Sequence, residues 1–213
     1  MFSNGKTPIA DAQTMRRLLS YSASFNALIA NRAIEPSLSK NAVAHESDLS
    51  SRLGLTGAPS AAERIMAERD VALAELTGGR LLIDMISSAE ALDVVRRAKS
   101  RDLEISCSVS INHLALNEVD IGDYRSFAKL DPPLREESDR LALLEGINDG
   151  TIDVIVSDHD PRPAGEKRLP YAEASTGAVG LEVLLAAGLS QVCLLYTSPS
   201  PRDQRGSRMP SSA

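Results

Sequence analysis

Apolar residues recur along most of the chain with one of two spacings, and each spacing predicts a type of element. Four segments with apolar steps of mostly three and four residues predict amphipathic helices, over residues 8–30, 60–79, 88–102 and 135–150. Three short apolar runs predict strands, over residues 80–87, 103–110 and 151–158. Helices that alternate with short strands are typical of a parallel sheet wrapped by helices, so the sequence predicts an α/β fold.

The expected helix ends carry capping residues. Asp11 or Thr7 can cap the first helix, and Ser88 can cap the third. The second helix closes on Gly78 and Gly79, a pair that suits a left-handed C-cap. Periodicity does not decide whether the sheet is open or closed into a barrel.

The strand that we expect to be buried at residues 152–156 runs directly into Ser-Asp-His-Asp-Pro. Loops that follow the carboxyl ends of parallel strands are where such folds keep their chemistry. Asp158 is the best single candidate, because a carboxylate there can ligate a metal and also accept a proton from water. A helix cap or loop turn is the alternative for Asp158, and a loop histidine with a backbone hydrogen bond is the alternative for His159.

Two further segments offer candidates. His113 also follows an apolar strand, so it can lie in the same site mouth as Asp158 and act as a metal ligand. The alternative is that His113 is packed in the core. Asp131 and Arg135 flank a Pro-Pro pair whose stiffness suits substrate positioning, or equally a strong helix start. Gly177 and Gly180 precede an apolar helix, where they allow close backbone approach to a ligand or a plain helix entry.

Composition narrows the class of protein. The 213 residues are 43% hydrophobic, enough for a normal core, and carry a formal net charge of −6. An acidic chain is a poor nucleic-acid binder, so we expect small molecules or proteins as partners. Neither a membrane span nor a signal peptide is evident, and we therefore expect no membrane association and a cytoplasmic location.

The carboxyl end differs from the rest of the chain. The apolar period stops, and the tail becomes rich in Ser, Pro and Arg. This composition predicts a disordered extension. We therefore divide the chain into a folded unit, residues 1–190, and a non-native-looking tail, residues 191–213.

Three segments together resemble the late half of a dihydroorotase, of the cyclic amidohydrolase group. They are "VSINHLALNEVDIGDYRSFAKLDPPLREESDR", "DGTIDVIVSDHDPRP" and "ASTGAVGLEVLLAAGLS". The order of the "PPLR" and "SDHxP" pieces is specific to that group. The "INHLALNE" and "TGAVGLE" neighbourhoods favour dihydroorotase over the alternatives, allantoinase and hydantoinase.

The resemblance implies a partial, metal-dependent (β/α)₈ barrel that lacks its first strands. Zinc is the implied cofactor, and the family's "HxH" metal ligands are expected upstream of Met1. Family members interconvert L-dihydroorotate and N-carbamoyl-L-aspartate in pyrimidine synthesis. By position Asp158 is implied to be metal ligand and general base, whereas Asp131, His159 and Arg162 are implied to contact the substrate.

Two departures from the family pattern bear on this implication. Arg32 and Met85 stand where the family has histidine ligands, and the spacing of His45 fits neither place. A guanidinium cation cannot replace a neutral imidazole at zinc, and a thioether is a poor ligand for it. The resemblance thus leaves two functions open: an enzyme whose fragment is itself inactive, or a non-catalytic subunit that holds aspartate carbamoyltransferase.

Overall fold

Five parallel strands form the main sheet of the protein, in the order β1-β2-β5-β6-β7. The computed structural model describes residues 1–195 and the side chains of residues 1–191. The strands are β1 (Phe2–Ser3), β2 (Leu28–Arg32), β5 (Arg80–Ile86), β6 (Ile105–Ser110) and β7 (Val154–Val156). The α/β class with a parallel sheet is therefore confirmed, and the described strands form an open sheet.

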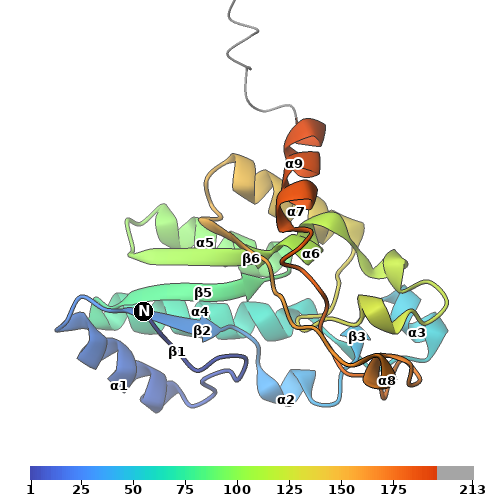
Figure 1. The fold of residues 1–213 in the computed structure, drawn as a ribbon. Coiled ribbons are helices and arrows are strands. Elements are labelled where there is room, and N and C mark those ends of the chain that lie inside the picture. Colours follow the sequence, from blue (N-terminus) through green and yellow to red (C-terminus); the bar gives the residue numbers. More distant parts are fainter. Residues whose placement is uncertain (196–213) are drawn as a thin grey trace, which may run out of the picture.

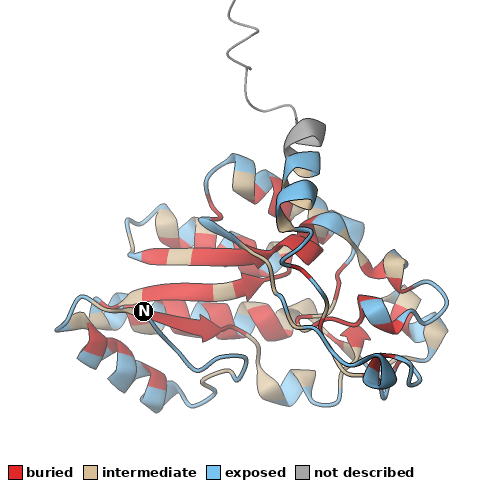
Figure 2. Cartoon of the chain, viewed as in Figure 1, coloured by how far each residue is buried: buried red, intermediate tan, exposed pale blue. Residues whose placement is uncertain are grey.

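Four helices connect these strands and pack against one another in chain order. They are α1 (Ala12–Ala23), α4 (Ser60–Thr77), α5 (Ala89–Lys99) and α7 (Glu137–Asn148). Their inward faces and the alternate residues of β5 and β6 form the main core, which is the buried centre of Figure 2. Because each helix buries one stripe against the sheet, the periodicity seen in the sequence is explained.

A second group of elements lies beyond the carboxyl ends of β2, β5 and β6 (Figure 1). It contains a two-stranded sheet of β3 (Ala44–His45) and β4 (Gly57–Ala58), and a smaller apolar cluster around Leu130, Leu134 and Tyr171. The short helices are α2 (Pro36–Ser39), α3 (Asp48–Leu53), α6 (Ile111–Ala115), η1 (Glu118–Ile121), η2 (Ser126–Ala128) and α8 (Ala164–Lys167). These loops and helices supply the side chains of the candidate site.

The helix ends agree with the capping residues in the sequence. The Asp11 carboxylate accepts from Thr14 N at 2.7 Å, and Ser88 Oγ accepts from Ala91 N at 3.3 Å. Gly78 takes the left-handed conformation expected at the end of α4. The caps therefore confirm the starts of α1 and α5 and the end of α4.

The prediction of one helix over residues 8–30 was wrong at its second half. Helix α1 ends at Ala23, Asn26 turns the chain with a positive φ of 52°, and residues 28–32 form β2. These residues are nearly all buried between β1 and β5, where both edges of the strand find backbone partners. Pairing across the sheet overrides the helical spacing of the apolar residues.

The prediction of a fully buried strand at residues 152–156 also needs correction. Ile152 is buried, but β7 begins only at Val154, and Val154 and Ile155 are 45% and 38% exposed. The reason is that β7 is an edge strand of the described sheet. Its position brings the residues that follow it beside the end of β6.

The carboxyl-terminal helix α9 runs over Leu184–Leu195, so residues 191–195 of the expected tail are helical. The remainder of that tail, residues 196–213, lies outside the described residues. No helix within the described part of the chain is long and apolar enough to cross a membrane.

Candidate functional site

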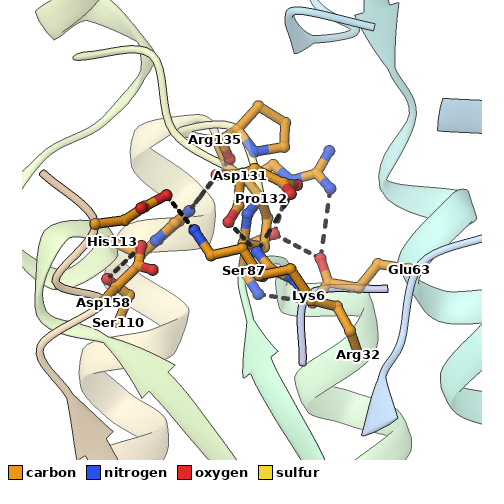
Figure 3. A network of polar contacts seen from close by, with 12 residues as sticks. Lys6, Arg32, Glu63, Ser87, Ser110, His113, Asp131, Pro132, Arg135 and Asp158 are labelled. Atoms are coloured by element: carbon orange, nitrogen blue, oxygen red, sulfur yellow. Dashed lines mark hydrogen bonds and ion pairs between the residues drawn. The ribbon is translucent and has the colours of Figure 1, made fainter. Parts of the chain in front are cut away.

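The site lies where the carboxyl ends of the parallel strands meet. Register pairs Arg32, the last residue of β2, with Asp84 near the end of β5. It pairs Ile86 at the end of β5 with Val109 of β6, and Ser110 with Val156 at the ends of β6 and β7. The ends of four neighbouring strands are therefore level. Side chains that follow them in sequence gather at this edge, as Figure 3 shows for Arg32, Ser110, His113, Asp131 and Asp158.

Asp158 follows β7 by two residues and turns toward the end of β6. Its backbone is left-handed, with φ of 47°, and the Ser110 hydroxyl lies 3.5 Å from Oδ2. Burial raises the pKa of Asp158 to about 6, although the Arg32 and Lys6 cations oppose the shift. A carboxylate with a pKa near neutrality can accept a proton and return it, which is what a general base requires.

Arg32 is the last residue of β2, and its side chain is only 3% exposed. Its Nη2 donates to the backbone carbonyl of Asp131 and lies 3.7 Å from the Asp131 carboxylate. The guanidinium thus anchors the loop that precedes α7. It also places a fixed positive charge near Asp158, whose pKa it lowers.

His113 lies in α6, fully buried, and contacts the same loop. Its Nε2 is 3.1 Å from the carbonyl of Pro132 and 3.3 Å from that of Pro133. Burial lowers the pKa of His113 to about 4, so the ring is neutral at pH 7 and Nε2 carries the proton it donates. The structure therefore uses His113 to hold the Pro-Pro loop, which agrees with the packed interpretation; a metal-ligating role of His113 stays a prediction.

Met85 lies near the end of β5 at an irregularity of the β5–β6 register. Its φ is positive, at 57°, a left-handed backbone conformation that costs conformational energy for residues other than glycine, asparagine or aspartate. Its backbone N–H donates to the Ser108 hydroxyl at 2.8 Å instead of to a neighbouring strand. The local geometry places Met85 at the edge that holds the site.

The other two candidates for substrate contact are exposed and already engaged. His159 Nδ1 accepts from the Leu181 N–H at 3.2 Å. Arg162 donates to Asp160 at 2.8 Å and to the carbonyl of Thr176 at 3.0 Å. Their contact with a substrate stays a prediction.

Arg135 does not project from its loop, contrary to one of the two predictions for it. It is buried and points toward α4, donating to Ser87 Oγ at 3.1 Å and to the carbonyl of Ala58 at 3.0 Å. It also lies 3.4 Å from Glu63 (Figure 3). Its Nη1 is 2.9 Å from His45 Nδ1, so His45 belongs to the same network. The reason is that the guanidinium compensates the buried Glu63 carboxylate.

Sequence reasoning missed two residues of the site. Ser110 ends β6 and reaches Asp158, and Lys6 lies in the loop after β1, where it forms an ion pair with Asp160. Lys6 was detectable in principle, because "FSNGKTP" reads as a loop after a strand. The contact between Lys6 and Asp160 was not detectable from the sequence, because 154 residues separate the two.

The side chains at this edge do not fit the zinc centre that the resemblance implies. Arg32 presents a cation, Met85 a thioether, and His113 Nε2 points at two carbonyl oxygens. Of the two candidate metal ligands, Asp158 and His113, Asp158 is the one that offers a suitable oxygen. Among the described residues, no group of three or more His, Cys, Asp or Glu could hold a metal ion.

Comparison with known proteins identifies relatives. No family model matches the chain. Dihydroorotase from Streptomyces coelicolor is 41% identical over 186 residues, covering 87% of this chain and 44% of the relative. Dihydroorotase from Desulforapulum autotrophicum is 37% identical over 185 residues, covering 87% and 43%. The chain is homologous to dihydroorotases. It spans less than half the length of these relatives.

Solved structures show the same fold. A D-hydantoinase aligns with a TM-score of 0.75 at 22% identity, over 88% of this chain and 43% of that one. The dihydroorotase from Saccharomyces cerevisiae, in complex with 5-fluoroorotic acid, aligns with a TM-score of 0.69 at 14% identity, over 88% and 50%. These likenesses confirm the α/β architecture of this dihydroorotase relative.

Proposed function

We propose that this chain supplies Asp158 to a dihydroorotase-like cyclic amidohydrolase that interconverts L-dihydroorotate and N-carbamoyl-L-aspartate. The observation that carries the proposal is the half-buried Asp158, with its pKa raised to about 6, at the carboxyl edge of a parallel sheet. The sequence identity to dihydroorotases supports this choice of substrate. As part of the same proposal, the five strands belong to a (β/α)₈ barrel.

In the hydrolytic direction, water adds to the ring amide carbonyl while Asp158 accepts a proton from that water. The proton then passes to the ring nitrogen as its bond to the carbonyl carbon breaks, which gives the open ureido acid. Burial assists this step because it holds the pKa of Asp158 close to the working pH. The Arg32 cation keeps the carboxylate available for proton transfer.

The test is an assay of L-dihydroorotate turnover in both directions, with allantoin and hydantoin as competing ring substrates. It uses the 213-residue chain and any longer product of the same gene. We expect turnover of dihydroorotate by the longer product, lowered about 10²–10⁴-fold by Asp158→Asn because the base is lost. We expect none by residues 1–213 alone, because no strand among the described residues pairs with the outer edges of β1 and β7. A longer product inert toward dihydroorotate would contradict the proposal.

A second function is favoured by Arg32 and Met85, which do not fit a zinc centre. It is that of a non-catalytic subunit that holds aspartate carbamoyltransferase in an assembly. Metal analysis together with size-exclusion chromatography distinguishes the two functions. Stoichiometric zinc with turnover indicates the enzyme, and a metal-free protein that co-elutes with a carbamoyltransferase indicates the subunit.

A further inference from the structure

The chain makes a long excursion directly after Asp158, over residues 160–178, which we call the flap. Its two ends lie side by side: His159 forms a parallel bridge with Ala178, and the Asp160 N–H donates to the Ala178 carbonyl at 2.9 Å. Figure 1 shows α8 at the outer end of this excursion. Because the two ends meet, the flap can move without displacing β7 or α9.

Few residues of the flap are buried. They are Lys167, Tyr171, Ala174 and Gly177, whereas the other flap residues are exposed or half-buried. Tyr171 packs into the smaller apolar cluster of the protein. Segments with few buried apolar contacts open locally at a low cost in free energy. The flap therefore depends on a small number of contacts to stay closed.

The Lys167 side chain is one of these contacts. The residue is 3% exposed, and its Nζ donates to the carbonyl of Ser126 at 2.9 Å and to that of Lys129 at 3.4 Å. The Lys129 carbonyl also accepts from the Gly177 N–H at 3.0 Å. Lys167 and Gly177 thus tie two distant parts of the flap to the segment around η2.

The Lys129 side chain makes the reciprocal contact, from the η2 segment to the flap. The residue is 5% exposed, and its Nζ donates to the Ala172 carbonyl at 2.9 Å. The same nitrogen lies 5.7 Å from the centroid of the Tyr171 ring, which suits a cation–π contact. Among the described residues, no carboxylate forms an ion pair with Lys129 or Lys167. Two buried lysines held by backbone carbonyls are unusual, because buried lysines normally pair with acids.

These lysines make closure of the flap a balance of opposing effects. Burial lowers the pKa of both, and the Lys129 cation adds to this effect at Lys167. The charged amines therefore lose hydration when the flap closes, and their bonds to the carbonyls offset that cost. Without the lysines, the buried carbonyls lose these donors, which also costs free energy. The closed flap is thus held by few contacts and is poised to open.

We propose that residues 160–178 open and close as one unit beside Asp158, with the side chains of Lys129 and Lys167 as the two latches. Gly177 supplies a hinge at the returning end, because its φ of 121° is one that other residues rarely adopt. Opening gives solvent more access to Asp158, which lies two residues before the flap. The inference goes beyond the proposed function and does not depend on it, because it concerns a motion of the free protein.

The experiment is amide hydrogen exchange, followed by NMR on the 213-residue chain without ligand. The reporters are the N–H groups of Asp160 and Gly177, whose hydrogen bonds close the base of the flap, and the Leu81 N–H in the main sheet is the reference. In the wild type, the two flap amides should have equal protection factors, lower than that of Leu81, because one opening exposes both. Unequal protection of the two flap amides would overturn the motion as one unit.

Two variants test the latches. Lys167→Met and Lys129→Met keep the length of the side chain and remove its N–H donors. Each is expected to speed exchange of both flap amides about 10–100-fold, because a hydrogen bond from a charged group is lost, and to leave Leu81 unchanged. Arg168→Met is the matched control: it removes a positive charge next to Lys167, and its exposed side chain bonds to no described residue, so exchange should not change.

Each outcome decides the role of the two lysines. Equal acceleration of both flap amides, with Leu81 unchanged, supports the latches. No acceleration, or the same acceleration in Arg168→Met, overturns them. Acceleration that includes Leu81, or a lysine variant that fails to fold, also overturns them, because the lysine then supports the whole fold and not the flap.

Discussion

The guanidinium of Arg32 donates to the backbone carbonyl of Asp131, a residue 99 positions further along the chain. This contact joins the end of β2 to the loop before α7, and His113 holds the next two carbonyls of the same loop. Arg32 stands where the family has a histidine ligand, and His113 is a candidate ligand, but both hold this loop in place. Because the side chains of Arg32 and His113 are both buried, they hold the loop that carries Asp131 from its buried side.

Replacing Arg32 should raise the pKa of Asp158 further. The Arg32 cation lowers this pKa, opposing the larger effect of burial, so Arg32→Gln removes a stabilising charge from the carboxylate. A carboxyl ¹³C NMR titration should show Asp158 above its present value of about 6. Arg97→Gln, a change on the exposed face of α5, serves as the control and should leave the titration unchanged.

Replacing Asp158 with asparagine should stabilise the fold at pH 7. The folded pKa of about 6 exceeds the unfolded value of 3.8, so the wild-type carboxyl favours folding below pH 3.8 and this contribution is lost as pH rises through 6. Asparagine avoids the buried charge and tolerates the positive φ. We expect a gain of about 1–2 kcal/mol in urea unfolding at pH 7, after allowance for partial exposure.

That gain should disappear well below pH 3.8, where the wild-type carboxyl is neutral in both the folded and the unfolded state. Asp149→Asn provides the opposite control. The pKa of Asp149 is lowered in the folded state by Thr151 and Arg96, although burial opposes them, so its loss should destabilise the fold at pH 7. A destabilised Asp158→Asn would show that the carboxylate is well solvated or paired.

His113 should make the protein sensitive to acid. Its folded pKa of about 4 lies below the ordinary 6.5, so the unfolded state binds more protons between these values. The stability contributed by the neutral ring is complete above pH 6.5 and is lost as pH falls toward 4. Relative to His113→Gln, the wild type should lose about 1.4 kcal/mol per pH unit in this window. Histidine NMR should show the ring protonated on Nε2, and a titration near 6.5 would contradict the assignment.

Gly180 should not accept a side chain. A Cβ at this position would lie 1.8 Å from the carbonyl oxygen of Ser157, a backbone atom that cannot move aside without displacing Asp158. We expect Gly180→Ala to lower the free energy of unfolding by about 1–3 kcal/mol, measured by urea unfolding. Gly188 lies in α9 with open space around it, so Gly188→Ala should be neutral or stabilising. Equal stability of the two variants would refute the close approach.

The position of Gly180 shows a packing role that neither interpretation of the sequence included. The sequence allowed either approach to a ligand or a plain helix entry, and the structure shows the glycine against the backbone that carries Asp158. Spacing alone could not reveal this contact, because Ser157 belongs to another segment. The glycine is required for packing of the loop after β7.

The sequence by itself determined the α/β class and the caps at Asp11, Ser88 and Gly78, and it singled out Asp158 as a candidate, because periodicity, capping and strand-end chemistry are local properties. Only the tertiary structure decided that residues 28–32 form a strand, that Arg135 faces Glu63, and that Lys6 meets Asp160. These outcomes depend on partners far away in the chain. The burial and pairing energies of segments far apart in the sequence decide these three outcomes, and no local pattern encodes those energies.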